Sequence, residues 1–224
     1  MLSLQLRSAP AGVLSVLAVG AHPDDIEIGS GGTLLSLAAS QPDLRLRYVV
    51  LTGAANRQLE ARNAAHAFLP EADITIDMLD LPEGHLPSAW AEVKGALESV
   101  RQSCSPDLIL APSAADAHQD HRTIGEIIPT VFRDHLCLSY EIPKWDGDVA
   151  RPAVYFPMPA HIARRKVELL NKCFPSQQGR DWWDDEVFLG LARLRGMECR
   201  ASYAEAFTCT KLVVGAPLSG LESG

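Results

Sequence analysis

Short apolar segments alternate with helix-like segments from residue 13 to residue 111, and this alternation limits the folds open to the chain. Runs rich in Val, Leu and Ile predict strands at 13–20, 44–51, 74–79 and 108–111. The spacing of apolar residues predicts helices at 33–39, 57–69 and 89–100. Strands that alternate with helices in this way form a mostly parallel sheet flanked by helices. We therefore predict an α/β fold.

The C-terminal third of the chain is less regular. We expect a further strand at 137–142 and helices at 162–173 and 187–194, with several prolines between them. There is no internal repeat, low-complexity tract or linker composition that would mark a boundary. We predict a single domain over residues 1–224.

Composition excludes several classes of protein. Hydrophobic residues make up 47% and charged residues 21%, which is ordinary for a globular protein and argues against disorder. The net charge of −8 disfavours nucleic acid as a partner. No apolar run reaches the ~18 residues of a membrane span. A homo-oligomer is compatible with the sequence.

The N-terminal segment and the cysteines together indicate a cytoplasmic protein. An apolar stretch after Arg7 resembles a signal peptide, but it continues directly into His22 and Asp24 without a cleavage region. We interpret it as the first core strand. The five cysteines are odd in number and form no CxxC pair, so they predict neither a disulfide framework nor a zinc finger.

Two polar clusters follow two of the predicted strands. The first, AHPDDIE, occupies residues 21–27, and the second, HQDH, occupies residues 118–121. In an open α/β sheet, ligands bind beyond the carboxyl ends of the strands. Either cluster alone would be interpreted as a turn or a surface helix. Together, they predict one site assembled from distant parts of the chain.

The residue types in these clusters suit a divalent metal. Imidazole nitrogen and carboxylate oxygen are donors for zinc, and two His with one Asp leave a coordination position open for water. An open metal site beside a spare carboxylate is typical of a hydrolase, since the metal activates water and the carboxylate takes the proton. The isolated histidines are interpreted as surface or core residues: His66, His85, His135 and His161.

These motifs resemble those of a known family. Residues 22–27 are similar to the AHPDDxE signature of the LmbE-like, or PIG-L, deacetylases, and residues 118–121 resemble that family's HxDH motif. The resemblance covers most of the chain. It extends to LTG at 51–53, Arg57 with Glu60, LPEG at 81–84, EIPKWDGD at 141–148, FPSQ at 174–177, RLRG at 193–196 and AEAF at 204–207. The later segments resemble a bacterial subgroup.

The resemblance implies a Rossmann-like fold and a zinc-dependent N-deacetylase that acts on an N-acetylglucosamine-type sugar or glycoconjugate. By motif position, His22, Asp25 and His121 would hold Zn²⁺, although Fe²⁺ or another divalent ion suits the same donors. Asp24 would be the general base that takes a proton from water. His118 would stabilise the oxyanion and protonate the leaving amine. Asp120 would orient His118 and tune its charge.

Substrate contacts are expected from three further residues. Arg57 matches an arginine that contacts substrate in the family. Glu83 stands where the family has Asp, and its longer side chain departs from that pattern. Lys144, with Trp145 and Asp146, would line the substrate cleft or form a solvated turn.

Three other functions compete with this interpretation. An amidase of the same family could cut a longer acyl chain or a sugar-thiol conjugate with the same residues. A nucleotide-binding loop at Gly29, Gly31 and Gly32 is disfavoured because GxGxxG fails at Leu34. A binding protein without catalysis would need neither Asp24 nor His118. Trp182 and Trp183 could form a sugar-stacking platform, an interface, or part of the core.

Overall fold

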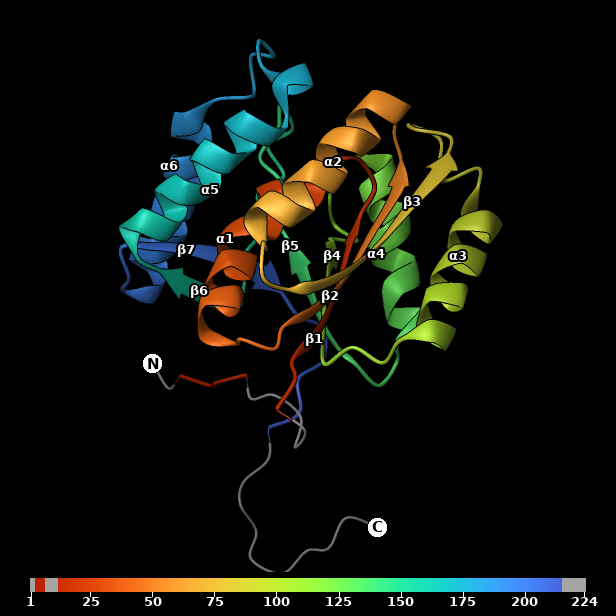
Figure 1. Cartoon of the computed structure of the whole chain (residues 1–224), viewed down its shortest axis with the longest axis horizontal. Coiled ribbons are helices and arrows are strands. Elements are labelled where there is room, and N and C mark those ends of the chain that lie inside the picture. The colour runs from red at the N-terminus through yellow and green to blue at the C-terminus, as the bar shows by residue number, and fades with distance from the viewer. Residues whose placement is uncertain (1–2, 7–11, 215–224) are drawn as a thin grey trace, which may run out of the picture.

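One sheet of seven strands, in the order β3-β2-β1-β4-β5-β7-β6, runs through the computed structural model (Figure 1). The structure describes residues 3–6 and 12–214. The strands are β1 (Ser15–Gly20), β2 (Arg45–Thr52), β3 (Asp73–Leu81), β4 (Leu108–Pro112), β5 (Leu136–Tyr140), β6 (Val154–Met158) and β7 (Tyr203–Thr208). Strands β1 to β5 are parallel, whereas β7 is antiparallel to both β5 and β6. This confirms the predicted α/β class.

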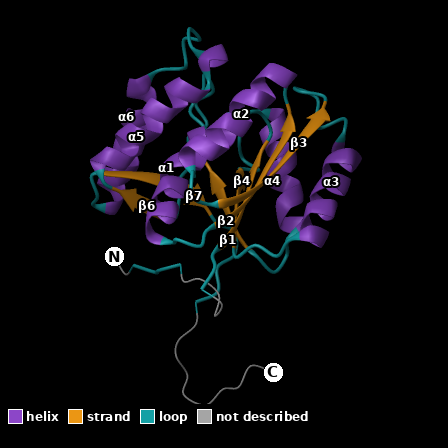
Figure 2. Cartoon of the chain, viewed as in Figure 1, coloured by secondary structure: helices purple, strands orange, loops and turns teal. Residues whose placement is uncertain are grey.

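Helices cover both faces of the sheet (Figure 2). They are α1 (Asp25–Ser40), α2 (Ala55–Phe68), α3 (Trp90–Ser103), α4 (Gln119–Val131), α5 (Ala160–Cys173) and α6 (Asp185–Cys199), with a 3₁₀ turn η1 (Pro175–Gln177). Helices α1, α2 and α5 pack with one set of strand side chains, and α3 and α4 pack with the alternate set. Because both faces of β1 and β4 are buried, these two strands are continuous apolar runs in the sequence, whereas the edge strand β3 is partly exposed and contains Asp77 and Asp80.

The order of the strands determines where a site can form. Strand β1 pairs with β2 on one side and with β4 on the other. The connection through α1 therefore leaves β1 in one direction, and the chain returns through α3 on the other side. A crevice opens at such a reversal, beyond the carboxyl ends of the strands. Both predicted polar clusters follow the two strands, β1 and β4, that flank it.

The glycine cluster lies in a helix, and the expectation that the helix begins at residue 33 is wrong. Helix α1 begins at Asp25 and includes Gly29, Gly31 and Gly32. A Cβ on Gly31 would lie 2.6 Å from the ring of Phe68, and one on Gly32 would lie 2.6 Å from Met158. Glycine therefore allows α1 to approach its neighbours closely, which overrides its low helix propensity.

Two strands of the C-terminal third complete the sheet, and neither β6 nor β7 is predicted from the sequence. A buried ion pair connects this region to α1, because Lys166 Nζ lies 2.6 Å from Glu205 Oε1. The same Lys166 donates to the carbonyl of Ile28, and the Glu205 carboxylate accepts from the backbone N–H groups of Gly32 and Thr33. These contacts unite α1, α5 and β7.

The structure also bears on the cysteines and on membrane insertion. All five cysteines are free thiols, as their spacing predicts. Among residues 3–6 and 12–214, no helix combines the length and the apolar character that crossing a bilayer requires.

Candidate active site

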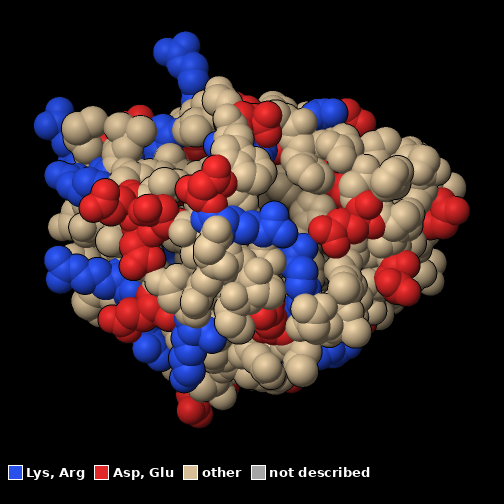
Figure 3. Space-filling model, turned by 90° about the horizontal axis from the view of Figure 1, so that it is seen from above, with Lys and Arg blue, Asp and Glu red and all other residues tan. Residues whose placement is uncertain are grey.

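Four segments meet beyond the carboxyl ends of the strands. The turn between β1 and α1 carries His22, Asp24 and Asp25, and the start of α4 carries His118 and His121. The start of α2 and the loop after β3 border these two segments. Figure 3 looks down on this end of the molecule, where acidic and basic side chains are intermixed around a hollow near the centre of the face.

The three predicted metal ligands form a compact triangle. His121 Nε2 lies 3.2 Å from Asp25 Oδ2 and 3.2 Å from His22 Nδ1. His22 Nδ1 lies 3.4 Å from the same carboxylate oxygen. All three residues are buried. One imidazole nitrogen from each His and one carboxylate oxygen thus lie within 3.4 Å of one another.

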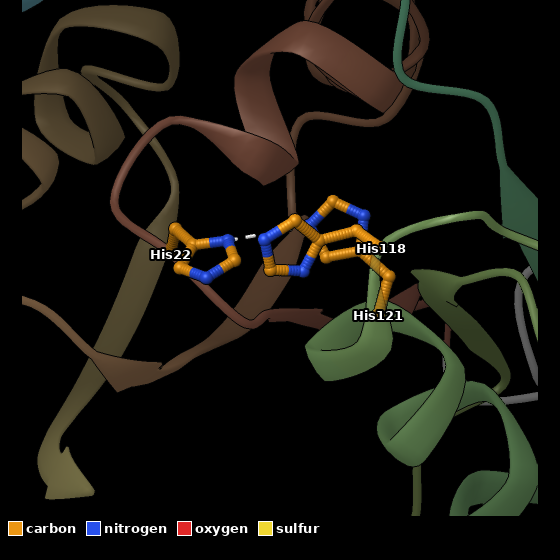
Figure 4. Close-up of side chains that lie close together, drawn as sticks. All are labelled: His22, His118 and His121. Carbon is orange, nitrogen blue, oxygen red and sulfur yellow. Dashed lines mark hydrogen bonds between the residues drawn. The ribbon is translucent and has the colours of Figure 1, made fainter. Parts of the chain in front are cut away.

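His118 completes a second set of donors. One ring nitrogen from each of His22, His118 and His121 can lie within 4.8 Å of the others, and Figure 4 shows the three rings together. The nitrogens of this three-histidine set are farther apart than the donor atoms of the triangle that includes Asp25, which lie 3.2 to 3.4 Å apart. The structure therefore brings together every residue of the two sequence motifs that was expected to bind metal.

Burial and neighbouring charges shift the pKa values of the triangle. Burial disfavours the charged form of Asp25, but His121 and His22 outweigh it and hold its pKa well below the usual range. Burial likewise opposes protonation of His22, yet Asp25 and Asp120 raise its pKa to about 10. Asp25 and Asp116 similarly outweigh burial at His121 and raise its pKa to about 9. A divalent ion that binds here must displace these protons.

Asp24 lies beside the triangle without belonging to it. Its side chain is buried, and its backbone has φ +120°, a conformation that non-glycine residues rarely adopt. Arg57 Nη2 lies 3.3 Å from Asp24 Oδ2 and donates to the carbonyl of Pro23 at 2.9 Å. Burial raises the pKa of Asp24 to about 7 against the opposing charge of Arg57. Strained backbone of this kind is concentrated at functional sites.

His118 is oriented by the helix that it caps. Its Nδ1 accepts from the backbone N–H of Asp120 at 3.2 Å, at the N-terminus of α4. A neutral His118 therefore carries its proton on Nε2. Burial lowers the pKa of His118, and the charges of His121 and His22 lower it further.

Asp120 acts on His118 through its backbone N–H, which donates to Nδ1, and through its charge, which opposes the lowering of the His118 pKa, whereas its carboxylate contacts His22. Asp120 Oδ2 lies 3.2 Å from His22 Nε2, on the side of the ring opposite the triangle. The same carboxylate accepts from the backbone N–H groups of Gly84 at 2.6 Å and Leu86 at 3.0 Å. Asp120 thus orients His22, while only its backbone orients His118. The contacts with Gly84 and Leu86 require tertiary structure, which explains why the motif alone does not reveal them.

Asp116 is a site residue that sequence reasoning missed. Its Oδ2 lies 3.1 Å from His121 Nδ1, and its Oδ1 accepts from the backbone N–H of His118 at 2.7 Å. Lys144 Nζ lies 3.0 Å from Asp116 Oδ1 and 2.8 Å from Asp148 Oδ2. The signal available in the sequence is its position between a buried strand and His118, which is the same signal that identified the motifs.

The three residues expected to bind substrate differ in their surroundings. Arg57 bridges Asp24 and Glu83, whose Oε1 lies 3.1 Å from Arg57 Nη1. The side chain of Glu83 is about half exposed, so the departure from Asp places a longer carboxylate at the surface beside Arg57. Lys144 is mostly buried, and its three polar contacts are with Asp116, Asp148 and the carbonyl of Ile142. Substrate contact by these residues stays a prediction.

The competing interpretation as a nucleotide-binding loop has no structural counterpart. The glycines on which it depends lie inside α1 and face the side chains of Tyr140, Phe68 and Met158. A phosphate-binding loop needs free backbone N–H groups at the start of a helix. Here the start of α1 is occupied by Asp24 and Asp25.

Comparison with known proteins identifies the family. The sequence model of the PIG-L family, described as GlcNAc-PI de-N-acetylase, matches residues 17–132. The chain is 31% identical over 142 residues to an uncharacterized deacetylase of Escherichia coli K12, YaiS. That alignment covers 58% of this chain and 74% of YaiS.

Solved structures share the fold. An N,N'-diacetylchitobiose deacetylase from Pyrococcus horikoshii has a TM-score of 0.66 and 19% identity, over 88% of this chain and 83% of its own. A 4-carboxy-2-hydroxymuconate hydratase from Pseudomonas putida has a TM-score of 0.72 and 17% identity, over 92% and 100%. At these identities the likeness concerns the fold alone, and the fold serves more than one reaction. The family assignment rests instead on the sequence match and the motifs: the chain belongs to the PIG-L, or LmbE-like, deacetylases.

Proposed function

We propose that this protein is a metal-dependent deacetylase that removes the acetyl group from an N-acetylglucosamine-type sugar or glycoconjugate. The observation that carries the proposal is the position of Asp24 and His118 beside three converging metal donors. Membership of the PIG-L family supports deacetylation as the class of reaction. The Pyrococcus horikoshii enzyme, named for diacetylchitobiose, supports an amino-sugar substrate by analogy.

The donors fit a zinc ion. Adjacent ligands of a tetrahedral ion bound at roughly 2.1 Å lie about 3.4 Å apart, and the triangle of His22, Asp25 and His121 has edges of 3.2 to 3.4 Å. His22 and His121 each have a carboxylate beside the other ring nitrogen, as metal-binding histidines usually do. We therefore assign these three residues to the metal and leave His118 free. Fe²⁺ suits the same donors.

When bound, the metal supplies a Lewis acid that favours ionisation of water and polarises the amide carbonyl. Asp24 accepts the proton that the attacking water loses, and Arg57 holds its carboxylate in place. His118 donates a hydrogen bond from Nε2 to the oxygen that gains negative charge. Neutral His118 has one ring proton, which it uses to donate to this oxygen, so we assign protonation of the leaving amine to Asp24 in place of His118, the residue that the family resemblance implies. The products are acetate and the free amine.

Acetate release tests this proposal. We expect the metal-loaded protein to release acetate from some members of a panel of N-acetylated sugars, glycosides and sugar nucleotides. A matched panel with longer acyl chains distinguishes the competing amidase, which would release those acids instead. If the protein holds one metal ion per chain and releases no acid from either panel, the proposal is contradicted.

Replacing Asp116 by Asn should weaken metal binding by about 10–100-fold, because His121 loses the charged partner of Nδ1. Competition with a chromophoric chelator measures the affinity. The control is Asp148→Asn, since Asp148 contacts Lys144 and the backbone of Ala117 but no His ring. Equal affinities in the two variants would contradict the role assigned to Asp116.

The cytoplasmic location and the single domain over 1–224 stay predictions, and so does homo-oligomer formation. We include the cytoplasmic location in the proposal because the free thiols suit a reducing compartment. Measuring the protein in the soluble and membrane fractions of its host tests this directly.

A further inference from the structure

Trp145 is an exposed indole held in a defined position. It retains 69% of its accessible surface, which is unusual for so large an apolar side chain. Its Nε1 donates to Asp181 Oδ1 at 3.1 Å, and its ring meets Trp182 edge-on, with centroids 6.3 Å apart at 77°. Trp182 in turn contacts Trp183, which is buried in the core. The hydrogen bond and the aromatic contact therefore fix the position of the ring and leave most of its surface accessible to a ligand.

The segment that carries Trp145 is attached to the active site. The residue before it, Lys144, contacts Asp116, which lies against His121. Asp148, three residues after Trp145, accepts from the backbone N–H of Ala117, next to the catalytic His118. The loop after β5 is thus connected at both ends to the loop that precedes α4, and Trp145 lies between the two attachments.

The partner of Trp145 belongs to a second segment that is attached to the other side of the site. Asp181 follows η1, where Ser176 donates from its backbone N–H and its hydroxyl to the carboxylate of Glu60, at 3.0 and 2.5 Å. Glu60 lies on α2, one turn after Arg57, which contacts Asp24. The contact between Trp145 and Asp181 therefore joins two loops. One is the loop after β5, which is attached to the loop before α4, and the other is the segment after η1, which is attached to α2.

The chemistry of this rim suits a neutral sugar ring. The C–H face of a pyranose packs on the face of an indole, and its hydroxyl groups donate to carboxylates. Asp146 and Asp181 place two exposed carboxylates beside Trp145. Those charges repel phosphate. We propose that Trp145, braced by Trp182, is a stacking platform for a neutral pyranose ring joined to the N-acetylated sugar. This inference rests on the proposed function and extends it to a substrate of at least two rings.

The test compares wild type, Trp145→Ala and Trp90→Ala. Trp90 is the matched control because it is also an exposed Trp, and its aromatic contact is with Lys94 of its own helix. N,N'-diacetylchitobiose and N-acetylglucosamine are the probes. Binding is followed by calorimetry, and turnover is followed by acetate release. We expect Trp145→Ala to raise Kd and KM for the disaccharide about tenfold, with kcat, metal content and KM for the monosaccharide unchanged. Trp145→Phe should recover most of the affinity.

Four outcomes are informative. Disaccharide binding that is equal in wild type and Trp145→Ala overturns the platform, and so does a wild type that binds no disaccharide. A change confined to the molecular mass in light scattering also overturns it, since Trp145 would then be an interface residue. Trp145-dependent binding without acetate release by wild type supports the platform while contradicting the deacetylase, so the two failures are distinguishable.

Discussion

Replacing Asp24 by Asn is expected to lower kcat by about 10²–10⁴-fold while the metal stays bound. The amide group has nearly the shape of the carboxylate but cannot accept the proton that water loses. Asp24 lies outside the triangle of His22, Asp25 and His121, so its charge is not needed to hold the ion by direct ligation. Acetate release and metal analysis on the same sample measure both quantities.

The choice of Asn has a structural reason. Asp24 has φ +120° and is buried, so a residue that disfavours positive φ would strain the turn for reasons unrelated to proton transfer. Asn tolerates positive φ better than most residues. A thermal unfolding curve close to that of wild type would exclude misfolding as the cause of lost turnover. Turnover within a few-fold of wild type would contradict the assignment of Asp24 as the base.

Replacing His121 by Ala should weaken metal binding by more than about 100-fold and reduce acetate release to the level of a chelated sample. His121 Nε2 is a vertex of the triangle, 3.2 Å from both other donor atoms. Loss of one of three donors leaves two, and a carboxylate with one imidazole binds a divalent ion weakly. Metal content after dialysis and competition with a chelator give the affinity.

The matched variant is His118→Ala. His118 is near enough to the other two rings to be a ligand, so the structure contains two alternative sets of donors. The assignment to His22, Asp25 and His121 requires His118→Ala to keep its metal and lose turnover. If His118→Ala loses metal as readily as His121→Ala, the three-histidine set is the correct one. Chelation of wild type should abolish turnover, and added metal should restore it.

Much of the fold can be predicted from the pattern of residues. The apolar runs that form β1 and β4, and the second half of β2, are buried on both faces, and such runs are distinctive in a sequence. The strands β6 and β7 could not be predicted in this way. Strand β7 contains Glu205, whose charge is paired with Lys166 from α5, so its burial depends on a contact between distant segments. The sequence pattern places the start of α1 at residue 33 and not at Asp25, because the three glycines before residue 33 suggest a loop.

For the candidate active site too, some features can be predicted from the sequence and others depend on the tertiary structure. The candidate metal donors and Asp24 lie in two short motifs beyond buried strands, and the resemblance of those motifs to the family implies the roles proposed for them. Which carboxylate orients which ring depends on tertiary structure. Asp120 faces His22 because the loop after β3 supplies two backbone N–H groups to its carboxylate. Asp116 is recognisable as a site residue only from the tertiary structure, in which its Oδ2 lies 3.1 Å from Nδ1 of His121.

The sequence by itself therefore determined the α/β class, the two motifs and the chemistry they can perform. Each depends on local pattern or on residue type. The tertiary structure decided the partners of His22 and His121, the enclosure of Lys144 between two carboxylates, and the joining of Trp145 to Asp181 across two loops. Those contacts join residues that are up to 98 positions apart, and only the packing of the helices on the sheet fixes which of them meet.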